Sequence, residues 1–178
     1  MKKGKKTLCT CFISLWMGFV VAMPSWAGQA QPGVQPPVRI KRPDVKAGLN
    51  VKVEKTGTNP EEVCYRVRPV FLARNIGTGT AQGFRVGLQW WASPPKEGSS
   101  WRSPNISLHP HEIRTWGPGP TWDINCCLSK ERKEHKTVLV VVTADANNNL
   151  WESNEGNNVV KKKVELHWTG HFTIQTAP

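Results

Sequence analysis

The amino-acid sequence predicts an all-β domain, an immunoglobulin-like antiparallel β-sandwich of about seven strands. Short runs alternate apolar and polar residues, Gly, Pro and Asn separate these runs, and no long stretch has the 3.6-residue apolar period of a helix. Each such strand has one apolar face, and two facing sheets bury those faces around a shared core. A small closed barrel is the alternative architecture.

Residues 1–27 are expected to be a secretory signal peptide. Four lysines precede an apolar run from about residue 8 to residue 22, and the small residues Ser25 and Ala27 occupy positions −3 and −1 of a cleavage site after Ala27. The run is shorter than the ~20 residues that span a membrane, which disfavours an N-terminal anchor. No second segment approaches that length. The processed chain is therefore expected to lack a transmembrane segment and to be exported, to the periplasm or out of the cell.

The composition after residue 27 indicates one folded domain between two tails. Residues 28–42 are rich in Pro, Gln and Gly and are expected to form an extended linker. The domain is expected over residues 43–168, and residues 169–178 are interpreted as a C-terminal tail. The leader contains four lysines and no acidic residue, so its removal lowers the formal net charge from +11 to +7. A basic surface favours acidic partners, but these charges are spread along the chain, so no specific nucleic-acid site is predicted.

The first two strands are predicted from period-two alternation. The first covers about residues 49–54, and the second covers about residues 64–73. Pro69 interrupts the second strand and predicts an edge position or a bulge, because proline has no N–H for a central ladder. A turn follows at residues 75–80, where glycines allow positive φ. The apolar residues that share a face on these strands are Leu49, Val51, Val53, Tyr65, Val67, Phe71 and Ala73.

The third strand, residues 84–92, has the clearest pattern. Apolar residues occupy every second position, and a one-residue slip would exchange its two faces, so its register is well specified. The remaining predicted elements are a loop at residues 93–100, a short strand and turn at 106–111, and strands at 121–128, 137–144 and 159–168.

Three cysteines remain after the leader, Cys64, Cys126 and Cys127. Export permits a disulfide, and an odd number leaves one thiol free or bonded to another chain. The adjacent pair is not expected to bridge to itself, because a vicinal disulfide strains the backbone. The expected bridge joins Cys64 to Cys127 or to Cys126. If the second and fifth strands are neighbours, Cys64 and Cys127 share the outward parity that a cross-strand bridge requires.

Three segments are familiar as a set. They are Pro-Asp-Val at residues 43–45, the Asn-x-Gly-x-Gly turn within residues 73–81, and the Glu-Ser-Asn-Glu-x-Asn-Asn run at residues 152–158. Together they resemble the CARDB family, a cell-adhesion-related domain found in bacteria. The resemblance covers about residues 43–168 and implies an immunoglobulin-like, non-enzymatic module of exported proteins. The tryptophans, the cysteines and residues 94–120 depart from the family's usual pattern, so any individual function is expected there.

The polar segment at residues 145–158 has two interpretations. Asn and Asp side chains hydrogen-bond nearby backbone, so a structural turn is the first. Its oxygens also suit Ca²⁺, and the spacing begins like an EF-hand loop, but Leu150 and Gly156 replace the Gly and Glu of its sixth and twelfth positions. No other cofactor is predicted. The candidate calcium ligands are Asp145, Asn147, Asn149, Glu152 and Glu155.

Tryptophan is the most distinctive residue type, with nine in the chain and two of them in the leader. Trp90, Trp122 and Trp168 have core parity. Exposed indoles suit sugar rings and protein hot spots, because they offer a large rigid area at low entropic cost. The alternative is that these side chains cover the ends of the sandwich. The candidates for exposure and binding are Trp91, Trp101, Trp116 and Trp151.

No catalytic arrangement is recognisable in the sequence. It contains neither a Gly-x-Ser-x-Gly elbow nor a His-Glu-x-x-His motif. The chain is therefore expected to be a non-enzymatic bacterial module of binding or adhesion type, which mediates protein interactions at or outside the cell envelope through a strand face or residues 94–120. The alternative is a carbohydrate-binding module that uses exposed tryptophans, and a hydrolase ranks below both.

Overall fold

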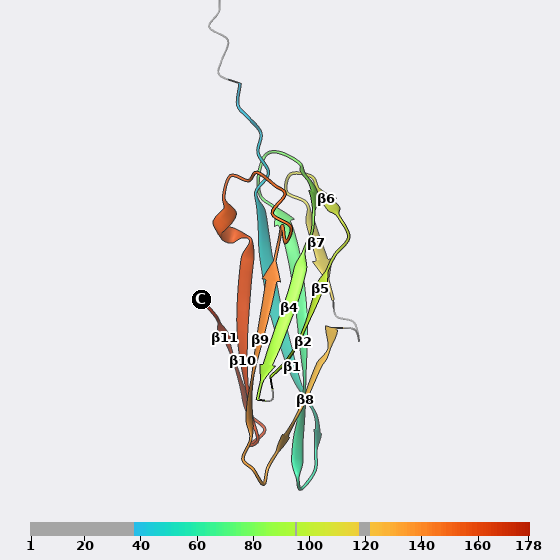
Figure 1. Cartoon of the computed structure of the whole chain (residues 1–178), viewed down its shortest axis with the longest axis vertical. Helices are drawn as coiled ribbons and strands as arrows, with labels where there is room; N and C mark the ends of the chain where they lie inside the picture. The colour runs from blue at the N-terminus through green and yellow to red at the C-terminus, as the bar shows by residue number, and fades with distance from the viewer. Residues whose placement is uncertain (1–37, 95, 118–121) are drawn as a thin grey trace, which may run out of the picture. The chain divides into compact units, whose positions relative to one another are not determined.

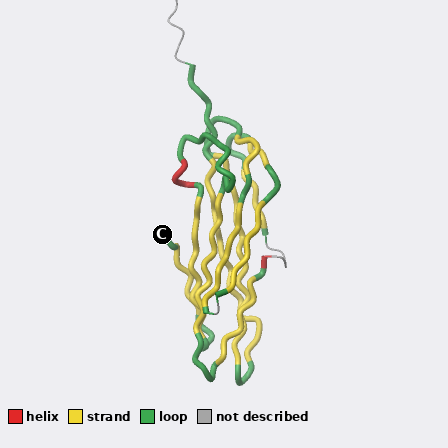
Figure 2. The backbone as a smooth tube through the Cα atoms, in the orientation of Figure 1, coloured by secondary structure: helices red, strands yellow, loops and turns green. Residues whose placement is uncertain are grey.

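Antiparallel strands build the part of the chain that a computed structural model describes, namely residues 38–94, 96–117 and 122–178 (Figures 1 and 2). Residues 39–178 form one compact unit with two main sheets around a single apolar core. The predicted all-β sandwich is therefore confirmed. The expected signal peptide and residues 28–37 of the expected linker lie outside the described residues. Within those residues, no helix is long and apolar enough to cross a membrane.

The first sheet is organised around β2 (Glu62–Asn75). Strand β1 (Val45–Thr58) pairs with β2 along nearly its whole length. On the other side of β2, β8 (Ile124–Ser129) pairs with residues 62–67 and β7 (Ile113–Trp116) pairs with residues 71–74. Strand β2 is therefore an interior strand of this sheet.

The second sheet has the strand order β11-β10-β9-β4-β5. Its central strand is β9 (His135–Thr143), flanked by β10 (Val159–His167) and β4 (Gly87–Ser93). The edge strands are β5 (Glu97–Arg102) and β11 (Phe172–Thr176). Strand β11 lies within residues 169–178, which were predicted to be a C-terminal tail without regular structure. It pairs with the predicted final strand, β10.

A short ladder, β3 (Ala81–Phe84) with β6 (Ile106–Leu108), lies beside the main sheets. The predicted third strand is thus divided between β3 and β4. The amide of Arg85 donates to Asn147 Oδ1, and the amide of Val86 donates to Ser103 Oγ, so side chains replace ladder partners at the break. The predicted alternation of faces continues across it, because Phe84, Val86 and Leu88 are all buried.

The core is formed by every second residue of the facing strands. Tyr65, Val67 and Phe71 of β2 are fully buried, as are the alternate valines of β9. The face that the sequence predicts for these strands is the buried one. The Tyr65 hydroxyl donates to the carbonyl oxygen of His167 at 2.6 Å and lies 3.1 Å from that of His171. Because β2 and β10 belong to different sheets, this phenol joins the two layers at the β10–β11 turn.

The prediction that Pro69 marks an edge strand or a bulge is wrong. Pro69 lies opposite Val51 in a continuous β1–β2 register, and the bulge in this pair lies between Lys55 and Gly57. On the other side of β2, residues 68–70 pair with neither β8 nor β7. The interior strand therefore has a local gap between two partners, where a residue without an N–H is accommodated.

The predicted loop at residues 93–100 is also a strand in part. Residues 97–102 pair with β4 as the second half of a hairpin. Gly98, Ser99 and Ser100 carry no apolar alternation, so periodicity gave no sign of this strand. This strand is defined instead by its backbone pairing with β4.

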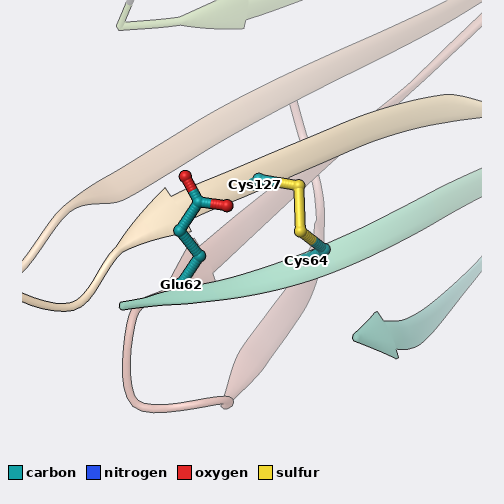
Figure 3. A group of neighbouring side chains, drawn as sticks. All are labelled: Glu62, Cys64 and Cys127. Carbon is teal, nitrogen blue, oxygen red and sulfur yellow. A yellow bond between two sulfur atoms is a disulfide. The ribbon is translucent and has the colours of Figure 1, made fainter. Parts of the chain in front are cut away.

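Cys64 and Cys127 lie opposite each other in the β2–β8 register and form a disulfide (Figure 3). This is one of the two pairings that the sequence leaves open. Cys126 is buried as a free thiol, and burial raises its pKa. The bridge closes a sequence separation of 63 residues, so the loss of unfolded-state entropy on cross-linking is large.

Reduction of this bridge is expected to lower the free energy of unfolding by roughly 2–4 kcal/mol. Guanidinium titration with and without reductant measures the difference. A Cys64→Ala/Cys127→Ala variant should match the reduced protein and show no response to reductant. An unchanged wild-type midpoint under reducing conditions would contradict this assignment.

Candidate functional site

The β4–β5 hairpin presents tryptophans on both faces of the second sheet. Leu88 of β4 is buried, and Trp101 lies opposite it in the ladder. Trp90 has the same parity as Leu88, and Ser99 lies opposite Trp90. Because directly opposed residues share a face, these side chains all face the interior of the sandwich at its β5 edge.

Four aromatic rings close this edge, and we call Phe71, Trp101, Trp116 and Trp122 the aromatic cluster. Phe71 of β2 is fully buried at its centre. Its ring centroid lies 5.8 Å from Trp101 and 5.8 Å from Trp122, both edge-on, and 5.7 Å from Trp116, which is stacked at 10°. Trp101 and Trp122 meet edge-on at 4.7 Å. The cluster therefore joins β5 of one sheet to β2 and β7 of the other and fixes the orientation of its indoles.

A hollow of about 300 Å³, which we call the tryptophan hollow, opens beside the aromatic cluster. Indole rings supply most of its apolar wall, and two neighbouring hydroxyl-bearing residues of β5 lie at its border. Such a combination suits a ligand with an apolar face and several hydroxyl groups. The lining residues are Leu88, Trp90, Ser99, Ser100, Trp101 and Trp122.

The outer face of the same hairpin carries Trp91, whose side chain is 40% exposed. Gly98 lies opposite it, and a Cβ at that position would lie 3.0 Å from Trp91 Cδ1 and 2.8 Å from the carbonyl oxygen of Trp90. Glycine therefore gives the indole room to lie close over the neighbouring strand. Ser99 and Ser100 border the shallow hollow on this face as well.

The structure separates the four predicted binding tryptophans. Trp101 lines the inner hollow, and Trp91 lies on the outer face of the same hairpin. Trp116 stacks on Phe71 and lines neither hollow. Trp151 is 68% exposed in the loop before β10, where the Arg42 guanidinium lies 3.7 Å from its ring centroid.

Sequence reasoning missed several residues of this site. Trp90 and Trp122 have core parity, but they lie at the sheet edge, where the inward face is only partly covered. Ser99 and Ser100 fell within the predicted loop. A glycine opposite an exposed tryptophan is a signal only once the pairing of the two strands is known.

The candidate calcium ligands mostly accept hydrogen bonds from the chain itself. Asp145 is buried at φ +50°, and its two carboxylate oxygens accept the amides of Asn149 and Leu150. Asn147 Oδ1 accepts the amide of Arg85, while the Asn149 side chain is exposed. These contacts are those of a structural turn.

Glu152 and Glu155 complete this polar network. Glu152 is buried, and its carboxylate accepts the amide of Val45 and the side-chain amide of Asn158. Glu155 accepts the amide of Glu152 and a second hydrogen bond from Asn158. Burial raises the pKa of Glu152, the Val45 and Asn158 hydrogen bonds oppose that rise, and the carboxylates of Glu155 and Asp145 add to it.

One group of three potential metal ligands occurs among the described side chains, namely Glu62, Cys64 and Cys127 (Figure 3). The two sulfur atoms are bonded to each other. A metal ligand must be a thiolate, so the disulfide form does not offer this group to a metal ion.

Comparison with known proteins finds no matching family model and no matching curated protein. Two solved structures of the CARDB domain of the PF1109 protein from Pyrococcus furiosus are similar to the chain. The crystal structure, described as a complex with di-metal ions, is 17% identical, covers 70% of this chain and 94% of that domain, and has a TM-score of 0.35. The solution NMR structure is 16% identical with the same coverage and a TM-score of 0.36. Both are described as CARDB domains, the family that the three sequence segments resemble. A likeness of this degree assigns no ligand.

The raised pKa of Glu152 makes its effect on stability dependent on pH. The folded-state pKa lies above the ordinary value of 4.5, so folding favours the protonated form of Glu152. The stabilisation that protonated Glu152 gives to the folded state is fully present below pH 4.5 and is lost as the pH rises through the folded-state pKa. The difference in unfolding free energy between wild type and Glu152→Gln is therefore expected to decrease from about pH 4 to about pH 7. Urea titrations across this range measure it. Glu61→Gln, at an exposed position, is the control. A difference that increases with pH would refute the assigned direction.

The polar network also allows a test of calcium binding. Because Asp145, Glu152 and Glu155 already accept hydrogen bonds, calcium chloride and chelator are expected to give the same melting midpoint for the protein. A ligand that binds only the native state must raise this midpoint. A rise with calcium that is lost in Asp145→Asn would instead establish the calcium site.

Proposed function

We propose that this chain is an exported, non-catalytic binding module whose ligand is a carbohydrate and whose binding site is the β4–β5 hairpin. One observation carries the proposal: three indoles, those of Trp90, Trp101 and Trp122, line one hollow with Ser99 and Ser100 beside them. Export is supported by the leader-like N-terminus and by a cysteine pair suited to an oxidising compartment.

The chemistry of this hollow matches that of a sugar ring. A pyranose has an apolar C–H face, which stacks on an indole, and a rim of hydroxyl groups, which exchange hydrogen bonds with serine hydroxyls and strand amides. Trp101 and Trp122 are held by their edge-on contacts with Phe71 and with each other. Rings that are already fixed lose little conformational entropy when a ligand binds.

A second candidate function is protein interaction, which the sequence favours. The observation in its favour is that β5 is the last strand of its sheet, next to β4 alone. Residues 98–101 of this edge are uncharged, so no charged side chain within this stretch opposes the addition of another strand. An extended segment of a partner protein would extend the sheet there through backbone hydrogen bonds, with Trp91 beside it.

Tryptophan substitutions test the carbohydrate proposal. On a glycan array, Trp90→Ala and Trp101→Ala are expected to lower the affinity about tenfold or more for any glycan that the wild type binds, because both indoles line the hollow and aromatic side chains are common binding hot spots. Trp151→Ala is the matched control, because this tryptophan is exposed but lies outside the hairpin. Circular dichroism checks that each variant is folded. If the wild type retains glycans and all three variants retain them equally, the hairpin site is wrong.

The same experiment separates the two candidates. If no glycan is retained at all, the carbohydrate proposal fails. Strand addition then predicts that an extended peptide selected from a displayed library perturbs the backbone amide signals of Gly98 and Ser100 at the β5 edge. Perturbation confined to β11, the other edge strand, would contradict the β5 assignment.

A further inference from the structure

The β4–β5 hairpin has a hollow on each of its two faces. The tryptophan hollow lies on the inward face, and a second hollow of about 320 Å³ lies on the solvent-facing side, which we call the outer hollow. The residues that line the outer hollow are Gln89, Trp91, Gly98, Ser99 and Ser100. Ser99 and Ser100 line both hollows. The two hollows are therefore continuous along β5.

The two serines point to opposite faces of the sheet, because consecutive side chains of a strand alternate. Ser99 lies opposite the inward-facing Trp90 and shares its face. Ser100 lies opposite Gln89 and shares the outer face. Only the backbone of β5 separates the hollows, and β5 is the last strand of its sheet (Figure 1). An elongated ligand that lies over this edge reaches both faces.

The outer hollow repeats the chemistry of the tryptophan hollow. Trp91 supplies a 40% exposed indole, and Gln89 and Ser100 supply an amide and a hydroxyl beside it. Gly98 lies opposite Trp91, and a Cβ there would lie 3.0 Å from Trp91 Cδ1 and 2.8 Å from the carbonyl oxygen of Trp90. The absence of a Cβ therefore keeps this indole close to β5. No charged side chain occurs among the described residues that line either hollow.

We propose that the two hollows are subsites for successive units of one uncharged oligosaccharide, which passes over the β5 edge. This inference rests on the proposed carbohydrate function and adds the class of glycan. One unit stacks on the indoles of the tryptophan hollow, and another stacks on Trp91. A charged unit would lose hydration without gaining an opposite charge, which disfavours an acidic glycan. Because the first contact raises the effective concentration of the second unit, affinity increases with chain length.

Isothermal titration calorimetry tests this arrangement with the monosaccharides, disaccharides and tetrasaccharides of cellulose, amylose and chitin. In a series that binds, the tetrasaccharide is expected to bind about tenfold or more tightly than the monosaccharide. Trp91→Ala should remove this increase and leave the monosaccharide affinity unchanged, whereas Trp101→Ala should weaken every length. Gly98→Ala, which displaces the Trp91 indole, should also reduce the increase. Trp151→Ala is the matched control and should keep it, and circular dichroism checks that each variant is folded.

The outcomes separate this inference from the proposed function. If no sugar of any length binds, the carbohydrate function and the two subsites fail together. If a monosaccharide binds but the tetrasaccharide binds no more tightly, the two subsites are wrong and the tryptophan hollow alone is supported. They are also wrong if Trp91→Ala keeps the wild-type increase with length. Tighter binding of tetragalacturonate than of the neutral tetrasaccharides would overturn the assignment of an uncharged ligand.

Discussion

Burial of one face of β2 is the constraint on which the rest of the structure depends. This strand pairs with β1 on one side and with β7 and β8 on the other, and its inward residues are fully buried. Tyr65 reaches the β10–β11 turn, and Phe71 centres the aromatic cluster. Because side chains alternate with a period of two, a slip of one residue would place Leu72 where Phe71 stands and separate Cys64 from Cys127. A single register therefore fixes the core, the disulfide and the wall of the tryptophan hollow together.

The three sequence segments with the CARDB resemblance meet in space away from the tryptophans of the β4–β5 hairpin. The amide of Val45 donates to Glu152, Asp44 accepts from Asn157, and the buried Asn75 accepts the amides of Asp44 and Gly77. Gly77 is required there, since a Cβ would lie 2.5 Å from the carbonyl oxygen of Arg42. The most specific motif of the sequence thus secures the entry of the chain into β1. It stabilises the domain and lies outside the tryptophan hollow.

This division explains what the sequence could predict. Alternation along β2, β9 and β10 is local, so it identifies the buried face of each strand without knowledge of its neighbours. The strand at residues 97–102 depends on pairing with β4, and its Gly-Ser-Ser run carries no such signal. Parity also placed Trp90 and Trp122 in the core, and it cannot tell whether an inward face is covered at the edge of a sheet. The lining of the tryptophan hollow was missed because it depends on which strands are neighbours.

The tryptophans of the hairpin differ in how closely binding and stability are linked. Trp101 packs against Phe71 and Trp122 while it lines the hollow, so its orientation there is fixed by the same packing that joins the two sheets. A change at Trp101 therefore acts on the closure of the sandwich as well as on the ligand surface. Trp91 lies on the outer face over Gly98 and has no partner in the aromatic cluster. Its side chain can therefore be replaced without disturbing the packing of the inner rings.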